Sequence, residues 1–122
     1  MNKGKKISGG KYIKNRKKRR GELPGQKIVV KLSESEKEKR KSKRVRGGNR
    51  KIAILQAKIV NISNKGKTKK AVIKNVAETP SDRFLARQNI ITKGTIVETD
   101  LGKVRITNRP AQEGVLNGVL VE

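Results

Sequence analysis

The feature that most limits how this chain can fold is the crowding of positive charge into its first part. Residues 1–50 hold 20 of the 33 Lys and Arg residues but only 4 acidic ones, and the 122-residue chain has a formal net charge of +23. Residues 1–26 contain too few apolar side chains to offset the conformational entropy lost on folding. We therefore expect a basic extension, residues 1–43, joined to one folded domain, residues 44–122.

A compact particle with this charge repels itself, which indicates a polyanionic partner. Nucleic acid is the first candidate, because each phosphate contact releases a condensed counterion. An anionic membrane is the alternative, but no apolar run in the sequence approaches the roughly 18 residues of a transmembrane helix. The basic N-terminus lacks the apolar centre of a secretory signal. We expect a cytoplasmic protein without a membrane partner.

Enzymatic chemistry has little support in the residue types present. The sequence contains no Cys and no His, which excludes disulfides, Cys/His zinc sites, thiol nucleophiles and imidazole bases. Glu98 and Asp100 are spaced for one strand face, but on such a cationic protein surface carboxylates more often balance neighbouring charges. The phosphate-loop pattern GxxxxGK[ST] is absent. We expect no enzyme, catalytic residue, metal, cofactor or small-molecule substrate.

The basic residues concentrate in two stretches of the first half. Six of the seven residues in Lys14–Arg20 are basic, which is typical of a solvated tail, of a localisation signal, or of an arm that becomes ordered on RNA. The stretch Lys43–Lys51, KRVRGGNRK, places arginines around a Gly-Gly-Asn turn. These turn residues tolerate positive φ, and the exposed N–H groups of such a turn suit phosphate. The alternative is a hairpin or linker whose charges lie in water.

Two segments lie between the first basic run and the folded domain. Lys27–Leu32, KIVVKL, is expected to form a short strand that packs on the later body. Residues 33–43 carry Ser33 and Glu36 at capping-box spacing, which favours a short helix. The same segment has no apolar stripe, which favours an extended linker, and the sequence leaves both alternatives open.

The second half has the pattern of a β-protein. We expect a turn at Asn64–Lys67, a bulge or strong bend within the strand over 68–76, and a single helical turn capped by Ser81 or Asp82. Phe84 is expected to lie in the core. Strands joined by tight turns are expected over 52–62, 68–76, 89–92, 95–99, 103–108 and 115–121, with a loop at 109–114. This spacing predicts an all-β fold, a small barrel of five to six short strands.

Several stretches resemble one known family. They are SGGK at Ser8–Lys11, KNRKKRR at Lys14–Arg20, RVRGGNRK at Arg44–Lys51 and RQNIITKGTIVETDLGKVRITNRP at Arg87–Pro110. Together they resemble the eukaryote-type small-subunit ribosomal protein eight (S-eight-e) family in its archaeal form, over almost the whole chain. The sequence departs from the family pattern around Gly21 and at Pro24–Gln26. The resemblance implies a small β-barrel with a basic N-terminal extension, buried in small-subunit ribosomal RNA beside other ribosomal proteins.

We therefore expect a structural constituent of the small ribosomal subunit that binds and stabilises folded ribosomal RNA. A free RNA-binding translation regulator and a chromatin-compacting protein are the alternatives. Two late turns are included among the candidate contacts, although ordinary hairpin chemistry is an alternative role for them. The candidate RNA-binding residues are Lys11, Lys14, Arg16, Lys17, Lys18, Arg19, Arg20, Arg44, Arg46, Gly47, Gly48, Asn49, Arg50, Lys51, Thr92, Lys93, Asn108 and Arg109.

Overall fold

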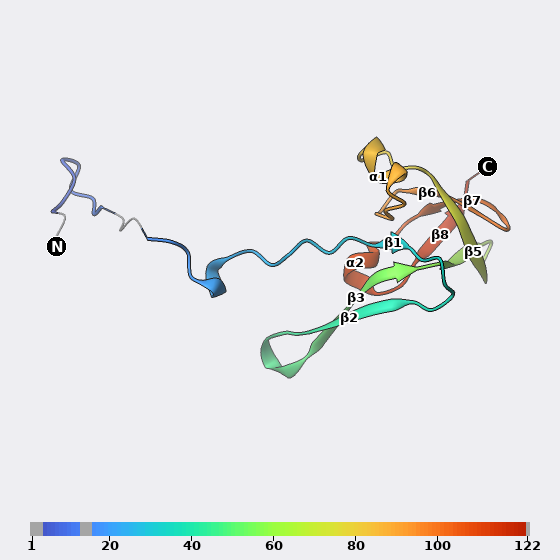
Figure 1. Cartoon of the computed structure of the whole chain (residues 1–122), viewed down its shortest axis with the longest axis horizontal. Helices are drawn as coiled ribbons and strands as arrows, with labels where there is room; N and C mark the ends of the chain where they lie inside the picture. The colour runs from blue at the N-terminus through green and yellow to red at the C-terminus, as the bar shows by residue number, and fades with distance from the viewer. Residues whose placement is uncertain (1–3, 13–15, 122) are drawn as a thin grey trace.

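The computed structural model describes residues 4–12 and 16–121, and it contains a β-barrel, a small sheet beside the barrel and an extended N-terminal arm (Figure 1). We use "the arm" for the described residues up to Gln26. Within the described ranges, no helix is long and apolar enough to cross a membrane. The elements in chain order are η1 (Arg20–Glu22), β1 (Lys31–Leu32), β2 (Lys39–Arg44), η2 (Arg46–Gly48), β3 (Arg50–Ala57), β4 (Ile59–Asn64), β5 (Lys67–Glu78), α1 (Arg83–Arg87), β6 (Ile96–Thr99), β7 (Gly102–Ile106), α2 (Pro110–Glu113) and β8 (Asn117–Leu120).

Strands β4 to β8 close into a five-stranded barrel, which confirms the all-β prediction. Neighbours in sequence pair antiparallel, and β8 returns to pair in parallel with β4. Because successive side chains of a strand point to opposite faces, alternate residues enter the core, as Val104 and Ile106 of β7 do. Closure leaves this sheet without a free edge, so a small core is protected from edge-to-edge association.

Two local features let such short strands curve into a closed barrel. The register of β5 against β6 shifts after Ile73 and again after Val76, which confirms the expected bulge. At Gly118 of β8, an added Cβ would lie 2.4 Å from Val104 Cγ1 and 2.9 Å from the Arg105 carbonyl oxygen. Strands β7 and β8 therefore approach each other more closely than any side chain at that position would permit.

A second sheet, in the order β1-β3-β2, lies against the barrel. Its strand β3 pairs in parallel with β1 and antiparallel with β2. Val30, just before β1, is only 2% exposed and belongs to the core, as expected for the KIVVKL segment. The boundary expected after residue 43 falls inside β2. A chain that began at Arg44 would therefore lack Val30, all of β1 and nearly all of β2. Whether residues 44–122 fold alone stays a prediction.

Residues 33–43 adopt neither a helix nor a free linker. They bend over residues 34–37 and continue as β2, which forms an antiparallel hairpin with β3. The expected single strand over 52–62 is wrong, since it divides at Lys58 into β3 and β4, which belong to different sheets. A continuous run of β-branched residues does not reveal where a chain leaves one sheet and enters another.

Three smaller expectations also differ from the structure. Asp82 caps α1 through a 2.9 Å hydrogen bond from the Phe84 N–H, as expected, but the Phe84 side chain is 62% exposed and does not fill the core. Residues 89–92 form no strand, because only Ile90 makes an isolated bridge, to Lys31. The loop expected at 109–114 contains α2, which begins at Pro110, a residue favoured in the first helical turn.

Candidate nucleic-acid interface

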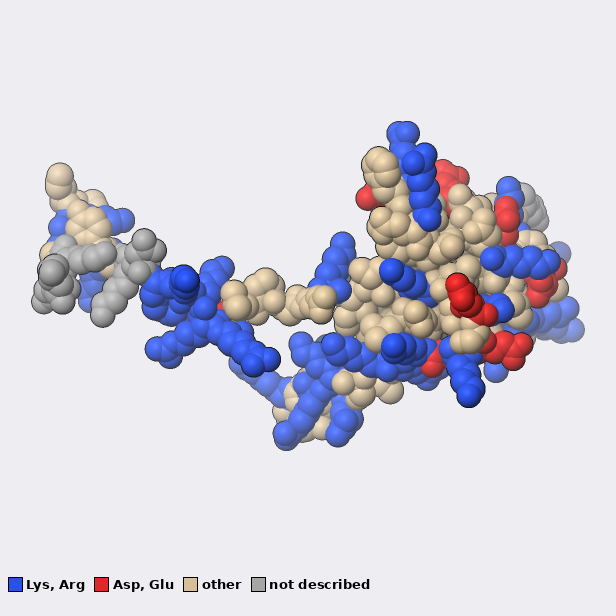
Figure 2. Space-filling view, in the orientation of Figure 1, with Lys and Arg blue, Asp and Glu red and all other residues tan. Residues whose placement is uncertain are grey.

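The arm presents its cations on an extended segment that leaves the barrel (Figure 2). Near its start, the Lys6 N–H donates to the Gly10 carbonyl at 2.8 Å, and Lys5 forms an isolated bridge with Lys11. The SGGK segment is thus a tight turn with exposed lysines on both sides. Lys14, one of the candidate contacts, lies outside the described residues.

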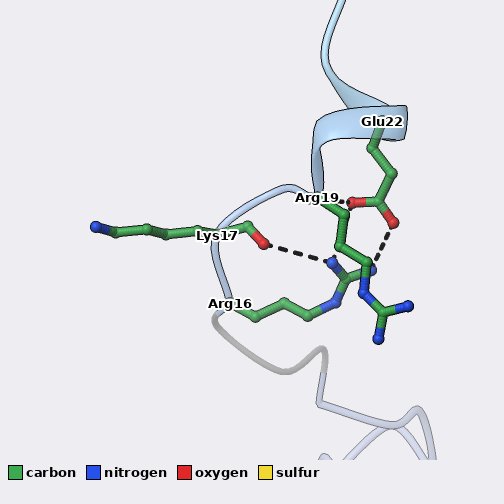
Figure 3. A network of polar contacts seen from close by, with 4 residues as sticks. All are labelled: Arg16, Lys17, Arg19 and Glu22. Atoms are coloured by element: carbon green, nitrogen blue, oxygen red, sulfur yellow. Dashed lines mark hydrogen bonds and ion pairs between the residues drawn. The ribbon is translucent and has the colours of Figure 1, made fainter.

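One ion pair organises the most basic part of the arm (Figure 3). The Arg16 guanidinium donates to both carboxylate oxygens of Glu22, at 2.8 and 3.0 Å, and the Arg19 N–H donates to the same carboxylate at 3.0 Å. The Arg16 guanidinium lowers the pKa of Glu22, with a further contribution from the Arg19 N–H. The Lys17 side chain extends away from the pair. The Arg16–Glu22 ion pair therefore holds the chain in a turn, and the neighbouring cations of residues 17–20 stay exposed.

Cations cover the hairpin formed by β2, η2 and the start of β3, residues 39–51, which we call the basic hairpin. Every residue of β2 is exposed, and residues 39–51 include eight Lys and Arg but no acidic residue. The turn closes through a 2.8 Å hydrogen bond from the Val45 N–H to the Asn49 carbonyl. Gly47 and Gly48 both have φ near +80°, a region that favours glycine. Asn49 has φ −68°, so of the three turn residues only the two glycines adopt the positive φ that all three tolerate.

The strand register sets like charges directly opposite each other at the tip of the basic hairpin. Lys43 faces Lys51, and Arg44 faces Arg50. Directly opposed like charges destabilise an antiparallel pair. Within the part of the chain that the structure describes, none of these four side chains forms an ion pair with an acidic residue. The geometry therefore concentrates positive potential at a site where the protein supplies no counter-charge.

The sequence did not single out the β2 cations as candidate contacts. Lys39, Lys41 and Lys43 alternate along β2 and so share one face, while Arg40 lies on the other face and donates to Glu38 at 3.0 Å. Alternation of apolar and polar residues is the usual signal of a strand, and KRKSKR has no apolar residue. Only pairing with β3 reveals these side chains as one row.

The two late turns contribute a second, smaller cationic region. Thr92, Lys93 and Arg109 line one groove, of about 580 Å³, that Lys27 also lines. The Thr92 hydroxyl lies 3.1 Å from the Thr95 hydroxyl. Asn108 is committed to the fold, because its side chain donates to the Val115 carbonyl at 2.7 Å and accepts from the Asn117 N–H at 3.0 Å. Roles in RNA binding for these residues stay predictions.

Lysine and arginine gather on residues 16–20 of the arm and on the basic hairpin, with a stretch of other residues between the two groups, whereas charges of both signs are mixed over the barrel (Figure 2). The fold and these surfaces define a class of protein: a small closed β-barrel with polycationic extensions, a form suited to a polyanion. The chain matches the model of a family described as Ribosomal protein S8e over residues 1–121. The chain belongs to the ribosomal protein S8e family, which confirms the resemblance seen in its sequence.

Individual relatives align over nearly their full length. A protein of Staphylothermus marinus named small ribosomal subunit protein eS8 is 51% identical over 120 residues, covering 97% of this chain and 92% of the relative. Proteins of the same name from Nanoarchaeum equitans and Methanosarcina barkeri are 48% and 41% identical, covering 95% and 97% of this chain and 91% and 94% of the relatives. The chain therefore has nearly the extent of these relatives.

Proposed function

We propose that this protein is a structural constituent of the small ribosomal subunit and lies in the cytoplasm as part of that particle. Its cations neutralise phosphates of folded ribosomal RNA and so reduce the repulsion between RNA helices. Family membership and the names of the archaeal relatives support the ribosomal assignment. Its partners are then small-subunit ribosomal RNA and neighbouring ribosomal proteins.

The observation that carries the RNA contact is the tip of the basic hairpin. Lys43 lies opposite Lys51, and Arg44 lies opposite Arg50, across β2 and β3. None of these four side chains has an acidic partner among the described residues. A free protein does not gain stability from such an arrangement, whereas RNA phosphates placed beside the paired cations supply the missing counter-charge. The hairpin is therefore a preformed phosphate-binding element, and the arm is a second element that follows the RNA surface.

We propose no catalytic role for the acidic residues. Asp100, considered above with Glu98 as a possible acid–base pair, forms an ion pair with Lys74 at 3.1 Å. The Lys74 and Asp100 side chains are both substantially exposed, so the ion pair lies at the surface of the barrel. Charge balance on the barrel accounts for this carboxylate.

A truncation tests whether the arm contributes contacts to RNA without contributing to the stability of the folded part. Residues 1–23 carry ten Lys and Arg, and a chain that begins at Pro24 retains Val30 and all strands. We expect this chain to melt near the temperature of the full chain. Its log–log salt slope for RNA binding should be less steep by about 0.7 for each lost phosphate contact, up to about 7 in total. Equal slopes for the two chains would refute a role for the arm.

A second experiment separates a ribosomal constituent from a free regulator. In a sucrose gradient of cell lysate, the proposed function places the protein in the small-subunit fractions, where it persists through a moderate salt wash. Crosslinking followed by RNA sequencing should then recover small-subunit ribosomal RNA. Recovery mainly in fractions without ribosomal subunits would favour the regulator and contradict the proposal.

A further inference from the structure

A pocket of about 430 Å³ opens at one end of the barrel. Its lining comes from the end of β4, the start of β5 and the end of β8, together with the turns that join β4 to β5 and β6 to β7. We call this pocket the barrel mouth. None of its lining residues belongs to the arm, the basic hairpin or the two late turns. The arm leaves the molecule on the opposite side from β5 (Figure 1), so the barrel mouth is a separate surface.

The register of β4 and β5 directs two lysines to the inner face of the barrel. Lys69 lies opposite Ile62, and Lys67 lies opposite Asn64. Ile62 is buried in the core, and directly opposed residues project from the same face of a sheet, so Lys69 shares the inner face. Lys67 is two residues earlier on β5 and shares that face too. Both lysines are exposed and, with Lys65 of the turn, form a cationic rim around the mouth.

The floor of the barrel mouth is aliphatic and lies on the same inner face. Leu120 of β8 is opposite Val104 of β7, which is fully buried, so Leu120 also projects inward. Leu120 packs on the core cluster and is partly exposed at the mouth. Leu101, in the turn between β6 and β7, is 49% exposed and lines the pocket beside Leu120 and Ile62. The lysine rim and the aliphatic floor therefore face one another within a single pocket.

The charge around the barrel mouth favours an anion. No acidic residue occurs among the described residues that line it. Asp100 precedes Leu101 in the chain, but it forms its ion pair with Lys74 at 3.1 Å and does not line the mouth. The Asn64 side chain offers a donor and an acceptor. A ligand that uses the whole lining has an anionic group for the rim and an apolar face for the floor.

The size of the pocket identifies the kind of ligand. A volume of about 430 Å³ falls in the range of roughly 300–1,000 Å³ for sites that enclose small molecules. A stable protein interface involves about 20–30 residues on each side, which is far more than the mouth provides. A phosphate group alone would leave the aliphatic floor uncovered. A single nucleotide combines a phosphate with the apolar face of a base and fits both parts of the lining.

We infer that the barrel mouth binds one unpaired nucleotide of the RNA, with its base over Leu101 and Leu120 and its phosphate at the lysine rim. The inference deepens the proposed function and rests on it. Recognition of RNA bases usually targets unpaired nucleotides, because a base in an A-form duplex is inaccessible to side chains. The barrel thus adds a base contact to phosphate contacts that carry no sequence information.

NMR of the leucine methyl groups tests this inference with the full-length protein. The probe is a short RNA hairpin with one unpaired adenine, and its reference is the same hairpin with that adenine paired. The methyl signals of Leu101 and Leu120 should shift with the unpaired probe only. The unpaired probe should also bind about threefold to tenfold more tightly, since partial burial of aliphatic surface favours it. Leu23, which is 53% exposed beside the basic run of the arm, is the internal control and should respond alike to both RNAs.

Two neighbouring lysines of β5 provide a matched pair of variants. Lys69 projects to the inner face, whereas Lys70, opposite Asn61, projects to the outer face. Lys69→Gln should reduce the preference for the unpaired probe by about twofold to fivefold, as expected for an exposed charge contact. Lys70→Gln removes the same charge and should leave that preference unchanged. Leu101→Ala, at an exposed turn position, should reduce the preference and the Leu120 shift, with paired-probe affinity unchanged within about twofold.

Adenosine monophosphate distinguishes a nucleotide of the RNA from a free nucleotide. In the RNA, contacts with the arm and the basic hairpin hold the unpaired base near the mouth at an effective concentration in the millimolar range. The free nucleotide lacks these contacts, so it should shift the Leu101 and Leu120 signals only at millimolar concentrations. The RNA probe should shift them at far lower concentrations.

The possible results separate the inference from the function on which it rests. Equal affinity for both hairpins, with the Leu101 and Leu120 signals unmoved, would overturn the barrel-mouth site and leave phosphate binding intact. Equal effects of Lys69→Gln and Lys70→Gln would also overturn it, because net charge alone would then account for the preference. Adenosine monophosphate that binds as tightly as the RNA would overturn the assignment to RNA. Failure of the unsubstituted protein to bind either hairpin would overturn both the RNA-binding function and the site.

Discussion

The opposed cations of the basic hairpin lead to an unusual prediction, in which one set of substitutions should stabilise the free protein and weaken its RNA binding. The set replaces Lys43, Arg44, Arg50 and Lys51 with Gln. Removing two directly opposed like-charge pairs relieves repulsion across β2 and β3. For a folded unit of this size, a few tenths of a kcal/mol or more per pair raises Tm by roughly 2–8 °C.

The same substitutions should reduce the salt dependence of RNA binding. Each phosphate contact contributes about 0.7 to the log–log slope for single-stranded nucleic acid, so the loss of four contacts makes the slope less steep by about 3. The assays are thermal unfolding without RNA and fluorescence-anisotropy titrations with small-subunit ribosomal RNA fragments at several salt concentrations. Both measurements use the same protein preparations.

A control with equal charge loss separates the local effect from the change in net charge. Lys65, Lys67, Lys69 and Lys70 lie at and beside the β4–β5 turn, where Lys67, Lys69 and Lys70 face uncharged partners. Replacing these four with Gln lowers the net charge by the same four units without removing a like-charge pair. If the hairpin variant melts no higher than this control, or if its salt slope is unchanged, then the reasoning about the hairpin is wrong.

Three further predictions concern the fold and the arm. Gly118→Ala should be destabilising by about 1–3 kcal/mol, because its Cβ would overlap the neighbouring strand, and Tm should fall by roughly 5–20 °C, whereas Gly21→Ala, with open space around it, should leave Tm unchanged. Phe84→Ala should cost little stability because the ring is exposed, while Ile54→Ala in the core should cost about 2–5 kcal/mol by chemical denaturation; equal costs would contradict the exposed position. The turn held by Glu22 should be fully present above pH 4.5, the carboxylate's unperturbed pKa, and should be lost as the pH falls through its lowered pKa; backbone amide chemical shifts measured by NMR during acid titration report the change, and Glu22→Gln should abolish that titration.

Short-range rules predicted most of the local structure in the second half. The turn at Asn64–Lys67 formed as expected because Lys65 and Gly66 adopt positive φ there, which suits a tight hairpin turn. The alternation of Val104 and Ile106 with charged residues predicted a half-buried strand, and both are buried. These signals act over a few residues, so a single sequence contains them in full.

Long-range pairing accounts for what the sequence did not reveal. β2 has no apolar residue and exists because β3 lies beside it, so its row of lysines became visible only from the register. Phe84 looked like a core residue because it is aromatic, but α1 turns its less bulky residue Ala86 toward the core. Burial depends on the direction in which an element packs, which composition does not encode.

The sequence by itself determined that the chain is a strongly cationic protein with a β-rich second half, because charge and hydropathy are properties of the residues alone. Its family pattern was also readable without coordinates. Only the tertiary structure decided which cations face each other at the hairpin tip, and that residues 25–28, β2, β3 and α2 line one groove. These features require segments distant in the chain to meet, and the meeting is governed by barrel closure and strand register.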